Sequence, residues 1–223
     1  MSDNSAARIN MVESQIRPNQ VTDARLLRAL MDIPRESFVP ASLRDLAYME
    51  VEIPVAPARQ GKPERRLMSP MPLARLIQLA EIKSDNLVLD VGCTTGYSTA
   101  LLARLAESVV GLESDEGLAE QASQTLMELE ADNAAVVSGA LPVGYAGEGP
   151  FDVILLNGCV PEVPESLLKQ LRVGGRLVAI ISEHNFGQAT LFRNIGGRVS
   201  RRAVFDAGGP PLPGFERAKE FVF

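Results

Sequence analysis

Residues 88–97 read Val-Leu-Asp-Val-Gly-Cys-Thr-Thr-Gly-Tyr, and this stretch decides the fold class. An apolar run that ends in a glycine turn and continues into a helical pattern is typical of a buried β-strand that leads into a helix. Gly92 and Gly96 let the backbone approach a ligand, because neither carries a Cβ. Asp90, ahead of the turn, adds an acceptor suited to a cationic, amine-bearing ligand. The stretch therefore predicts a nucleoside-type site, although a tight strand–helix turn without a ligand stays open.

The chain beyond this turn continues to alternate between strand and helix patterns. Strands are expected at 87–91, 108–113, 134–138, 151–156 and 176–181, with helices at 98–105, 116–129 and 165–171 and a β-rich tail at 198–205 and 220–223. Such alternation predicts a parallel sheet with helices on both faces. Ligands of such sheets bind beyond the carboxyl ends of the strands. We therefore expect the site near Gly92, Glu113, Ala140 and Asn157.

The first third of the chain has a different pattern. Residues 9–48 have apolar residues at helical spacing, residues 50–66 are rich in proline and glycine and predict a loop, and residues 71–82 predict a helix. We expect one domain over residues 1–223. It consists of an N-terminal helical extension with a lid loop (1–82) and a Rossmann-like core (83–223).

The class of nucleoside ligand follows from the turn. Glu113 ends the second strand of the core, 21 residues after Gly92, where an acidic side chain can accept hydrogen bonds from ribose hydroxyls. A nicotinamide dinucleotide site also needs glycine at the positions of Thr94 and Tyr97, to admit the pyrophosphate and pack the helix. A methyl donor has no pyrophosphate. The turn therefore favours a methyl donor.

Composition excludes several other functions. The chain has 46% hydrophobic and 22% charged residues and a net charge of −6, which argues against binding to a nucleic-acid backbone. No apolar stretch approaches the roughly 18 residues that span a bilayer, and the first residues lack a signal-peptide pattern. Cys93 and Cys159 do not indicate a disulfide framework, so we expect a cytoplasmic protein. The single histidine, His184, predicts a polar loop, and no metal site is expected.

Five sequence blocks resemble those of the protein-L-isoaspartate (D-aspartate) O-methyltransferase family, in order and spacing. They are Met11-Val12 with Gln15-Ile16-Arg17, Ile33–Pro40, Val88–Ala103, Pro150–Ile154 and Gln170–Leu177. The resemblance covers nearly the whole chain. It implies the class I S-adenosylmethionine-dependent methyltransferase fold, an α/β fold with a mostly parallel seven-stranded sheet. It also implies methyl transfer to the free carboxylate of L-isoaspartyl residues in damaged proteins, which is protein repair.

The same resemblance implies the site residues. The donor pocket would be formed by Asp90, Gly92, Cys93, Thr94, Gly96, Glu113, Ala140 and Leu141, and residues 66–70 would form the lid and the substrate side. The chain departs from the family in three segments: Met68-Ser69-Pro70 replaces its Ser-Gln-Pro triplet, Thr94 replaces its middle glycine, and Ala140 replaces an aspartate. Ser69 is the candidate catalytic residue, unless it only caps the helix that follows.

These departures leave two alternative functions open. Met68 in place of a serine motivates a methyltransferase with another acceptor. Thr94 and Ala140 motivate a non-catalytic protein that binds a partner or ligand through a degenerate pocket.

Overall fold

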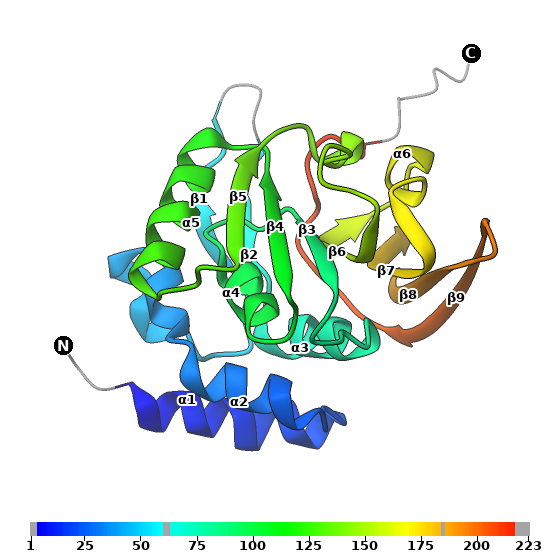
Figure 1. Cartoon of the computed structure of the whole chain (residues 1–223). Helices are drawn as coiled ribbons and strands as arrows, with labels where there is room; N and C mark the ends of the chain where they lie inside the picture. The colour runs from blue at the N-terminus through cyan, green and yellow to red at the C-terminus, as the bar shows by residue number, and fades with distance from the viewer. Residues whose placement is uncertain (1–3, 60–62, 184–185, 217–223) are drawn as a thin grey trace, which may run out of the picture.

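A computed structural model describes residues 4–59, 63–183 and 186–216, and its centre is a seven-stranded sheet (Figure 1). The strand order is β5-β4-β3-β6-β7-β8-β9. The first five of these strands run parallel, and β8 and β9 are antiparallel. The strands are β3 (Leu87–Val91), β4 (Ser108–Glu113), β5 (Ala134–Ser138), β6 (Phe151–Val160), β7 (Leu171–Glu183), β8 (Phe186–Ile195) and β9 (Arg198–Asp206). The expected Rossmann-like, mostly parallel sheet is confirmed.

The topological switch lies at β3, which pairs with β4 on one side and with β6 on the other. The chain runs outward from β3 to β5 and then returns to β6. The carboxyl ends of β3, β4 and β6 therefore meet at one edge of the sheet, and such a switch point is where ligands of open α/β sheets bind. This edge contains the turn at residues 92–96.

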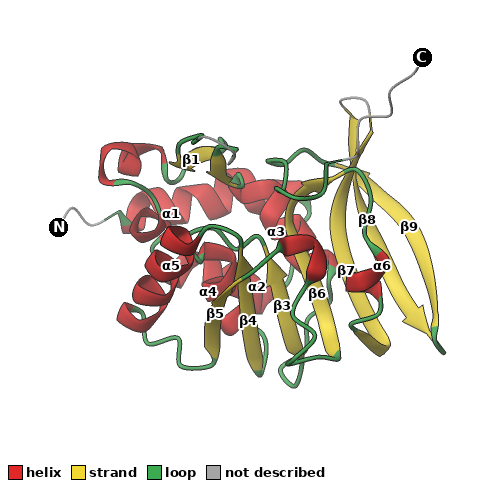
Figure 2. Cartoon of the chain, turned by 90° about the horizontal axis from the view of Figure 1, so that it is seen from above, coloured by secondary structure: helices red, strands yellow, loops and turns green. Residues whose placement is uncertain are grey.

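The two faces of the sheet are covered unequally (Figure 2). One core cluster, which includes Val88, packs α3 (Pro70–Leu79), α4 (Tyr97–Ala103) and α5 (Glu116–Glu128) against one face. The other cluster, which includes Leu89, packs against the opposite face. There the cover comes from α6 (Glu165–Leu168), the short helix η5 (Leu141–Val143), Leu212 and Phe215. Irregular C-terminal chain therefore replaces a second helical layer.

The N-terminal extension consists of short helices that pack on α3 and α4. They are α1 (Ser5–Met11), η1 (Val12–Ile16), η2 (Arg17–Asn19), α2 (Ala24–Asp32), η3 (Arg35–Phe38) and η4 (Ala41–Leu46). Gln78 on α3 joins the two parts, because its amide oxygen accepts the N–H groups of Thr22 and Asp23 and its nitrogen donates to the Gln20 carbonyl. The mostly helical pattern expected over residues 9–48 is confirmed.

Residues 50–66 are not only the loop that the sequence predicts. They contain β1 (Ile53–Ala56), which pairs antiparallel with β2 (Arg65–Leu67). Prolines at 54, 57 and 63 obscure the strand pattern, and proline is tolerated here because this sheet has only two strands, both of them edges. The hairpin brings Arg65 into the core.

Smaller differences concern the ends of elements. The helix expected at 71–82 spans Pro70–Leu79, and the one expected at 165–171 ends at Leu168. β7 begins at Leu171, before the glycine pair at 174–175. Two expectations, the polar loop at His184 and the β-rich residues 220–223, lie outside the described residues.

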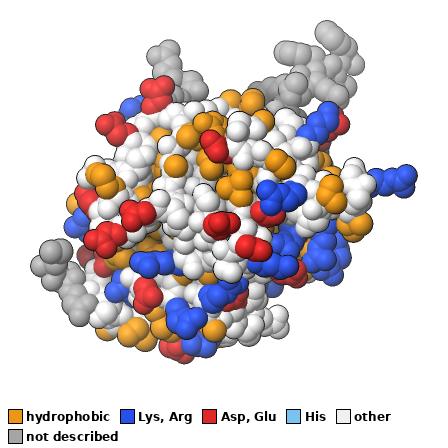
Figure 3. Space-filling model, viewed as in Figure 1, with side chains coloured by type: hydrophobic (Ala, Val, Ile, Leu, Met, Phe, Trp, Pro, Cys, Tyr) orange, Lys and Arg blue, Asp and Glu red, His pale blue; other side chains and the backbone are white. Residues whose placement is uncertain are grey.

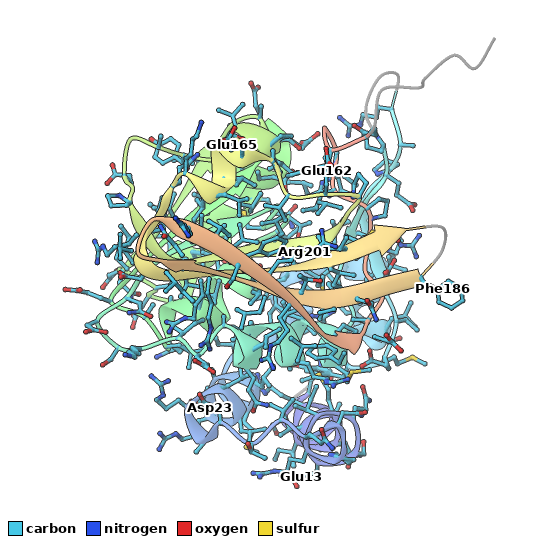
Figure 4. All side chains as sticks on the ribbon, turned by 90° about the vertical axis from the view of Figure 1, so that its right-hand side faces the viewer. Glu13, Asp23, Glu162, Glu165, Phe186 and Arg201 are labelled. Carbon is cyan, nitrogen blue, oxygen red and sulfur yellow. The ribbon has the colours of Figure 1, made fainter. Side chains whose placement is uncertain are left out.

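Side chains of both charge signs occur on the face seen in Figure 3. In Figure 4, Glu13 and Asp23 extend from the N-terminal helices, and Phe186 projects from the start of β8 with 82% of its surface exposed. Within the described ranges, no helix is both long and apolar enough to cross a membrane.

Candidate functional site

The turn after β3 is held in a fixed shape by backbone conformation and hydrogen bonds. Gly92 and Gly96 have φ of 81° and 94°, in the left-handed region that glycine tolerates, and Thr94 has φ of 53°. The Gly92 N–H donates to the Leu112 carbonyl at 2.8 Å, which ties the turn to β4. The Thr95 hydroxyl donates to the Phe38 carbonyl at 2.7 Å, which ties the turn to the N-terminal extension. The predicted turn is therefore present and rigidly positioned.

Asp90 lies at the carboxyl end of β3 and is fully buried. Its Oδ2 accepts the hydroxyl protons of Ser98 at 2.6 Å and Thr99 at 2.7 Å. Its Oδ1 is buried without a hydrogen-bond partner among the described residues. Burial raises the pKa of Asp90 to about 6, the Glu113 carboxylate adds to this rise, and the two hydroxyls oppose it. One acceptor of this carboxyl group is thus left over for a ligand.

Asn157, on the neighbouring strand β6, repeats this arrangement. Its Nδ2 donates to the Ser98 hydroxyl at 2.8 Å, and its buried Oδ1 has no partner in the described parts of the chain. The sequence placed Asn157 at the ligand edge but gave it no role. Because buried polar atoms are rarely left unsatisfied, two such acceptors on adjacent strands suit a donor-rich cation such as an ammonium group. Asn157 therefore joins Asp90 as a candidate contact for a cationic amine.

Glu113 lies at the end of β4 as predicted, but its carboxylate is already paired. Arg65 of β2 donates to both oxygens, from Nη2 at 2.8 Å and from Nε at 3.3 Å, and both side chains are buried. The carboxylate also accepts the backbone N–H groups of Thr94, Ser114 and Asp115. No sequence pattern indicates Arg65 as a partner, because it lies 48 residues from Glu113 in a stretch predicted to be a loop. In this conformation, Glu113 has no oxygen free for ribose hydroxyls.

The space over Gly92 is also taken by the protein itself. A Cβ built on Gly92 would lie 2.6 Å from Leu212 Cδ2, 3.5 Å from Arg65 Nη2 and 3.6 Å from Leu141 Cδ1. Leu141 is fully buried, whereas Ala140 is exposed. The structure therefore places Leu141, one of the predicted pocket residues, beside the turn, and adds Leu212, which no sequence pattern indicated.

Ser69 occupies the N-cap position of α3 without capping it. Its backbone is extended, with φ of −60° and ψ of 152°, but its side chain accepts no hydrogen bond from the helix. The Glu50 carboxylate instead accepts the Met71 N–H at 3.0 Å. The capping interpretation of Ser69 is therefore wrong, and its catalytic role stays a prediction. Met68 is buried, and Arg35 Nη2 donates to its carbonyl at 2.6 Å.

Cys93 does not supply a nucleophile to this site. It is fully buried, and its sulfur lies 3.2 Å from where a Cβ on Gly111 would be. Burial raises the pKa of its thiol well above 9, with a further rise from the Asp90 and Glu113 carboxylates. The side chain therefore stays protonated and fills space beneath the turn. Among the residues that the structure describes, no cluster of His, Cys, Asp and Glu could hold a metal ion.

A cavity of about 440 Å³ lies beside this closed site, between the β1–β2 hairpin and the start of α5. Its lining includes Val55, Arg65, Ser114, Leu118 and Pro213. Its volume falls in the range of small-molecule sites. Arg65 borders the cavity and also reaches Glu113, so its side chain separates the cavity from the turn.

Comparisons with known proteins show which family this chain resembles. The family model of protein-L-isoaspartate (D-aspartate) O-methyltransferase matches residues 6–206. A protein-L-isoaspartate O-methyltransferase from Koribacter versatilis is 35% identical over 207 residues, which cover 93% of this chain and 90% of the relative. Another from Yersinia enterocolitica is 35% identical over 176 residues, 79% of this chain and 82% of the relative.

Solved structures show the same fold. A protein-L-isoaspartate O-methyltransferase has a TM-score of 0.78 at 23% identity, over 95% of this chain and 66% of that protein. A Plasmodium falciparum β-aspartate methyltransferase in complex with S-adenosyl-L-homocysteine has a TM-score of 0.74 at 19% identity, over 95% and 99%. At such identities, the likeness concerns the fold. With the match of the family model over most of the chain, the conclusion is that this chain belongs to the protein-L-isoaspartate (D-aspartate) O-methyltransferase family.

Proposed function

We propose that this chain transfers a methyl group from S-adenosylmethionine to the free carboxylate of L-isoaspartyl residues in damaged proteins. Membership of the family supports the reaction. The observation that carries the assignment to this site is the pair of unsatisfied buried acceptors, Asp90 Oδ1 and Asn157 Oδ1, at the carboxyl ends of β3 and β6. They are the groups that a ligand with a cationic amine would satisfy.

The chemistry of the residues fits the methyl donor, while the conformation leaves no room for it. Asp90 and Asn157 would hold the amine, Glu113 would accept the ribose hydroxyls once released from Arg65, and Leu141 would flank the adenine. When bound, S-adenosylmethionine supplies a methyl group activated by its sulfonium. Because Gly92 has no Cβ, the donor could lie directly against the backbone of the turn, whereas a Cβ on Gly96 would face Ala122 of α5.

Methylation of a carboxylate does not require a general base from the protein. A carboxylate is ionised at pH 7 and is its own nucleophile. The residues of this chain would therefore orient the acceptor and exclude water, and no cysteine thiolate is required. Ser69 and Met68 lie just before α3, and the Met68 carbonyl is held by Arg35. We propose that residues 66–70 form the side of the site that binds the methyl acceptor.

Partner and location follow from simpler features. We propose protein or peptide substrates rather than nucleic acid, since the chain has a net charge of −6. We also propose a cytoplasmic location, supported by the free thiols of Cys93 and Cys159.

The test is turnover of a synthetic peptide that contains one isoaspartyl residue. Methyl-labelled S-adenosylmethionine should give labelled peptide ester, and the same peptide with a normal aspartyl residue should give none. Since ionised Asp90 would bind the donor amine, Asp90→Asn should lower kcat/KM about 10-fold or more. Asp132→Asn, an exposed acid, is the matched control. Absence of ester at high enzyme and donor concentrations would remove the assignment.

A further inference from the structure

The segment of residues 207–215, here called the closing segment, lies across the carboxyl end of β6. The Cys159 N–H donates to the Pro210 carbonyl at 2.8 Å, and the Leu212 N–H donates to the Cys159 carbonyl at 3.0 Å. Cys159 and Pro211 form a parallel bridge. In Figure 1, the red end of the chain returns beside β3 and β6. The segment is thus attached to β6 by one isolated bridge and two backbone hydrogen bonds, beside the proposed donor edge.

Leu212 packs the closing segment against Gly92 and Gly158. Its side chain is buried, and its Cδ2 lies 2.6 Å from a Cβ built on Gly92 and 2.8 Å from one built on Gly158. Real Cβ atoms essentially never come so close, so a side chain at either position would force Leu212 out of this conformation. The same two bare backbones would be needed by a ligand at the strand ends. Leu212 and the donor therefore compete for one space.

Arg65 closes the other half of the site. Its guanidinium makes a two-point contact with Glu113, with 4% and 0% of the two side chains exposed, and its Nη1 is buried without a partner in the described chain. Vicinal ribose hydroxyls would use the same two carboxylate oxygens. Ribose can therefore bind Glu113 only after Arg65 has moved, for example toward the cavity that it borders.

The closed site still contains buried polar atoms and is not purely apolar packing. Leu212 offers no donor to Asp90 Oδ1 or Asn157 Oδ1, which both stay buried and unsatisfied. A pocket that had been converted permanently to packing would not keep these two polar atoms, because each costs free energy when buried without a partner. The arrangement is that of a closed conformation which a ligand can open.

We propose that the closing segment and Arg65 form a two-part gate, which holds the donor site shut and must open for S-adenosylmethionine to bind. This inference rests on the proposed donor. A site that is competent for only part of the time binds its ligand more weakly by that fraction. Variants that weaken the gate should therefore bind the donor more tightly than the unchanged chain.

The experiment is calorimetric titration of the full chain with S-adenosylhomocysteine, which binds without turnover. Leu212→Ala and Arg65→Gln should each tighten binding about 10-fold, and the double variant should tighten it further, because each removes part of the closure. Leu212→Met, which keeps the bulk, and Arg172→Gln, which breaks the exposed pair with Asp152 at the opposite ends of the strands, are the controls. They should bind like the unchanged chain.

Hydrogen exchange of the unchanged chain gives a readout that needs no variant to fold. S-Adenosylhomocysteine should speed exchange at the amides of Cys159 and Leu212, since opening breaks their hydrogen bonds. Unchanged affinity in both gate variants, or slower exchange at these amides, would overturn the gate. So would a failure of every variant to bind at millimolar ligand. Tight binding by the gate variants without turnover of isoaspartyl peptide would instead leave the gate standing and remove the proposed function.

Discussion

A carboxyl group with a pKa of about 6 sits in the core at residue 90. Such a group weakens the fold at neutral pH, because its charged form is buried with one oxygen unpaired. Retention of a buried, perturbed carboxyl at a strand end is typical of a binding site. The sequence predicted Asp90 as a ligand contact from its place before the glycine turn. It could not predict the hydroxyls of Ser98 and Thr99, which depend on how α4 packs.

The pH dependence of stability tests this residue. The folded state binds the Asp90 proton more tightly than the unfolded chain, so this contribution to stability is fully present below about pH 4 and is lost as pH rises through 6. Asp90→Asn carries no such charge. Relative to the unchanged chain, its free energy of unfolding should therefore increase between pH 4 and pH 7.5, by up to about 3 kcal/mol for two pKa units.

Urea unfolding at both pH values measures this difference. Asp132→Asn, at an exposed position, should show no comparable change. A stability difference for Asp90→Asn that stays constant from pH 4 to pH 7.5 would contradict the buried, protonatable carboxyl.

Glu113 shows the limit of prediction at this scale. Its spacing from Gly92 located it correctly at the end of β4. Its partner Arg65 could not be predicted, because no local pattern links two residues 48 positions apart and prolines obscure the hairpin that contains Arg65.

Among the elements, the start of α3 is held by a buried cation in the N-terminal extension. Arg35 donates from Nε to the Ala47 carbonyl at 2.7 Å and from Nη2 to the Met68 carbonyl at 2.6 Å, and its guanidinium lies 4.7 Å from the centre of the Tyr97 ring. One side chain thus joins η3, the residue after η4, the connection between β2 and α3, and α4. Burial lowers its pKa from the usual value, yet arginine stays charged at any ordinary pH.

Arg35→Met should lower the free energy of unfolding by about 2–4 kcal/mol, because two buried carbonyls lose a charged donor. Chemical denaturation of the purified variant measures the loss. The control is Arg28→Met, at an exposed position on α2, which should stay within about 0.5 kcal/mol. An equal effect of the two substitutions would show that Arg35 anchors nothing.

Regular elements of the core were predictable because their apolar runs are short and flanked by turn residues. β3, β4 and β5 begin and end where the sequence placed them. The β1–β2 hairpin was missed, since its pairing depends on burial of Arg65 and Leu67 rather than on strand propensity. The predicted end of a strand differs from the observed end where pairing with a neighbouring strand makes it longer. β6, for example, continues to Val160 because it pairs with β7.

The whole molecule shares one large core cluster between the N-terminal extension and the sheet. Leu30 of α2, Leu76 of α3 and Val88 of β3 all belong to it, and all are fully buried. The single domain predicted for residues 1–223 stays a proposal. The predicted boundary at residue 82 separates the extension from the Rossmann-like core in sequence, but the core cluster contains residues from both sides of it. A shared core of this kind favours one cooperative unfolding transition.

Thermal unfolding followed by far-UV circular dichroism and by tyrosine fluorescence should therefore give one coincident transition. Leu30→Ala should shift both signals together, with a loss of about 2–5 kcal/mol from the cavity that it creates. Ile9→Ala, at a half-exposed position on α1, should have little effect. If thermal unfolding of Leu30→Ala, followed by circular dichroism, shows two steps, the N-terminal extension unfolds as an independent unit.

At this scale, the sequence predicted helices on both faces but not what covers the second face. Pro210, Pro211 and Pro213 give the closing segment no periodicity, so its place could be fixed only by tertiary contacts. Phe215 and Leu212 complete the second core cluster, although α6 is only four residues long. A short α6 and a proline-rich C-terminal segment therefore act as one cover.

The two glycines under Leu212 have a consequence for descent within the family. A homologue with any side chain at the position of Gly158 would meet the Pro210 carbonyl at 2.5 Å and could not seat the closing segment in this way. Glycine at 158 and a bulky apolar residue at 212 should therefore be inherited as a pair. If the proposed gate is correct, relatives that lack one residue of the pair should also lack the other.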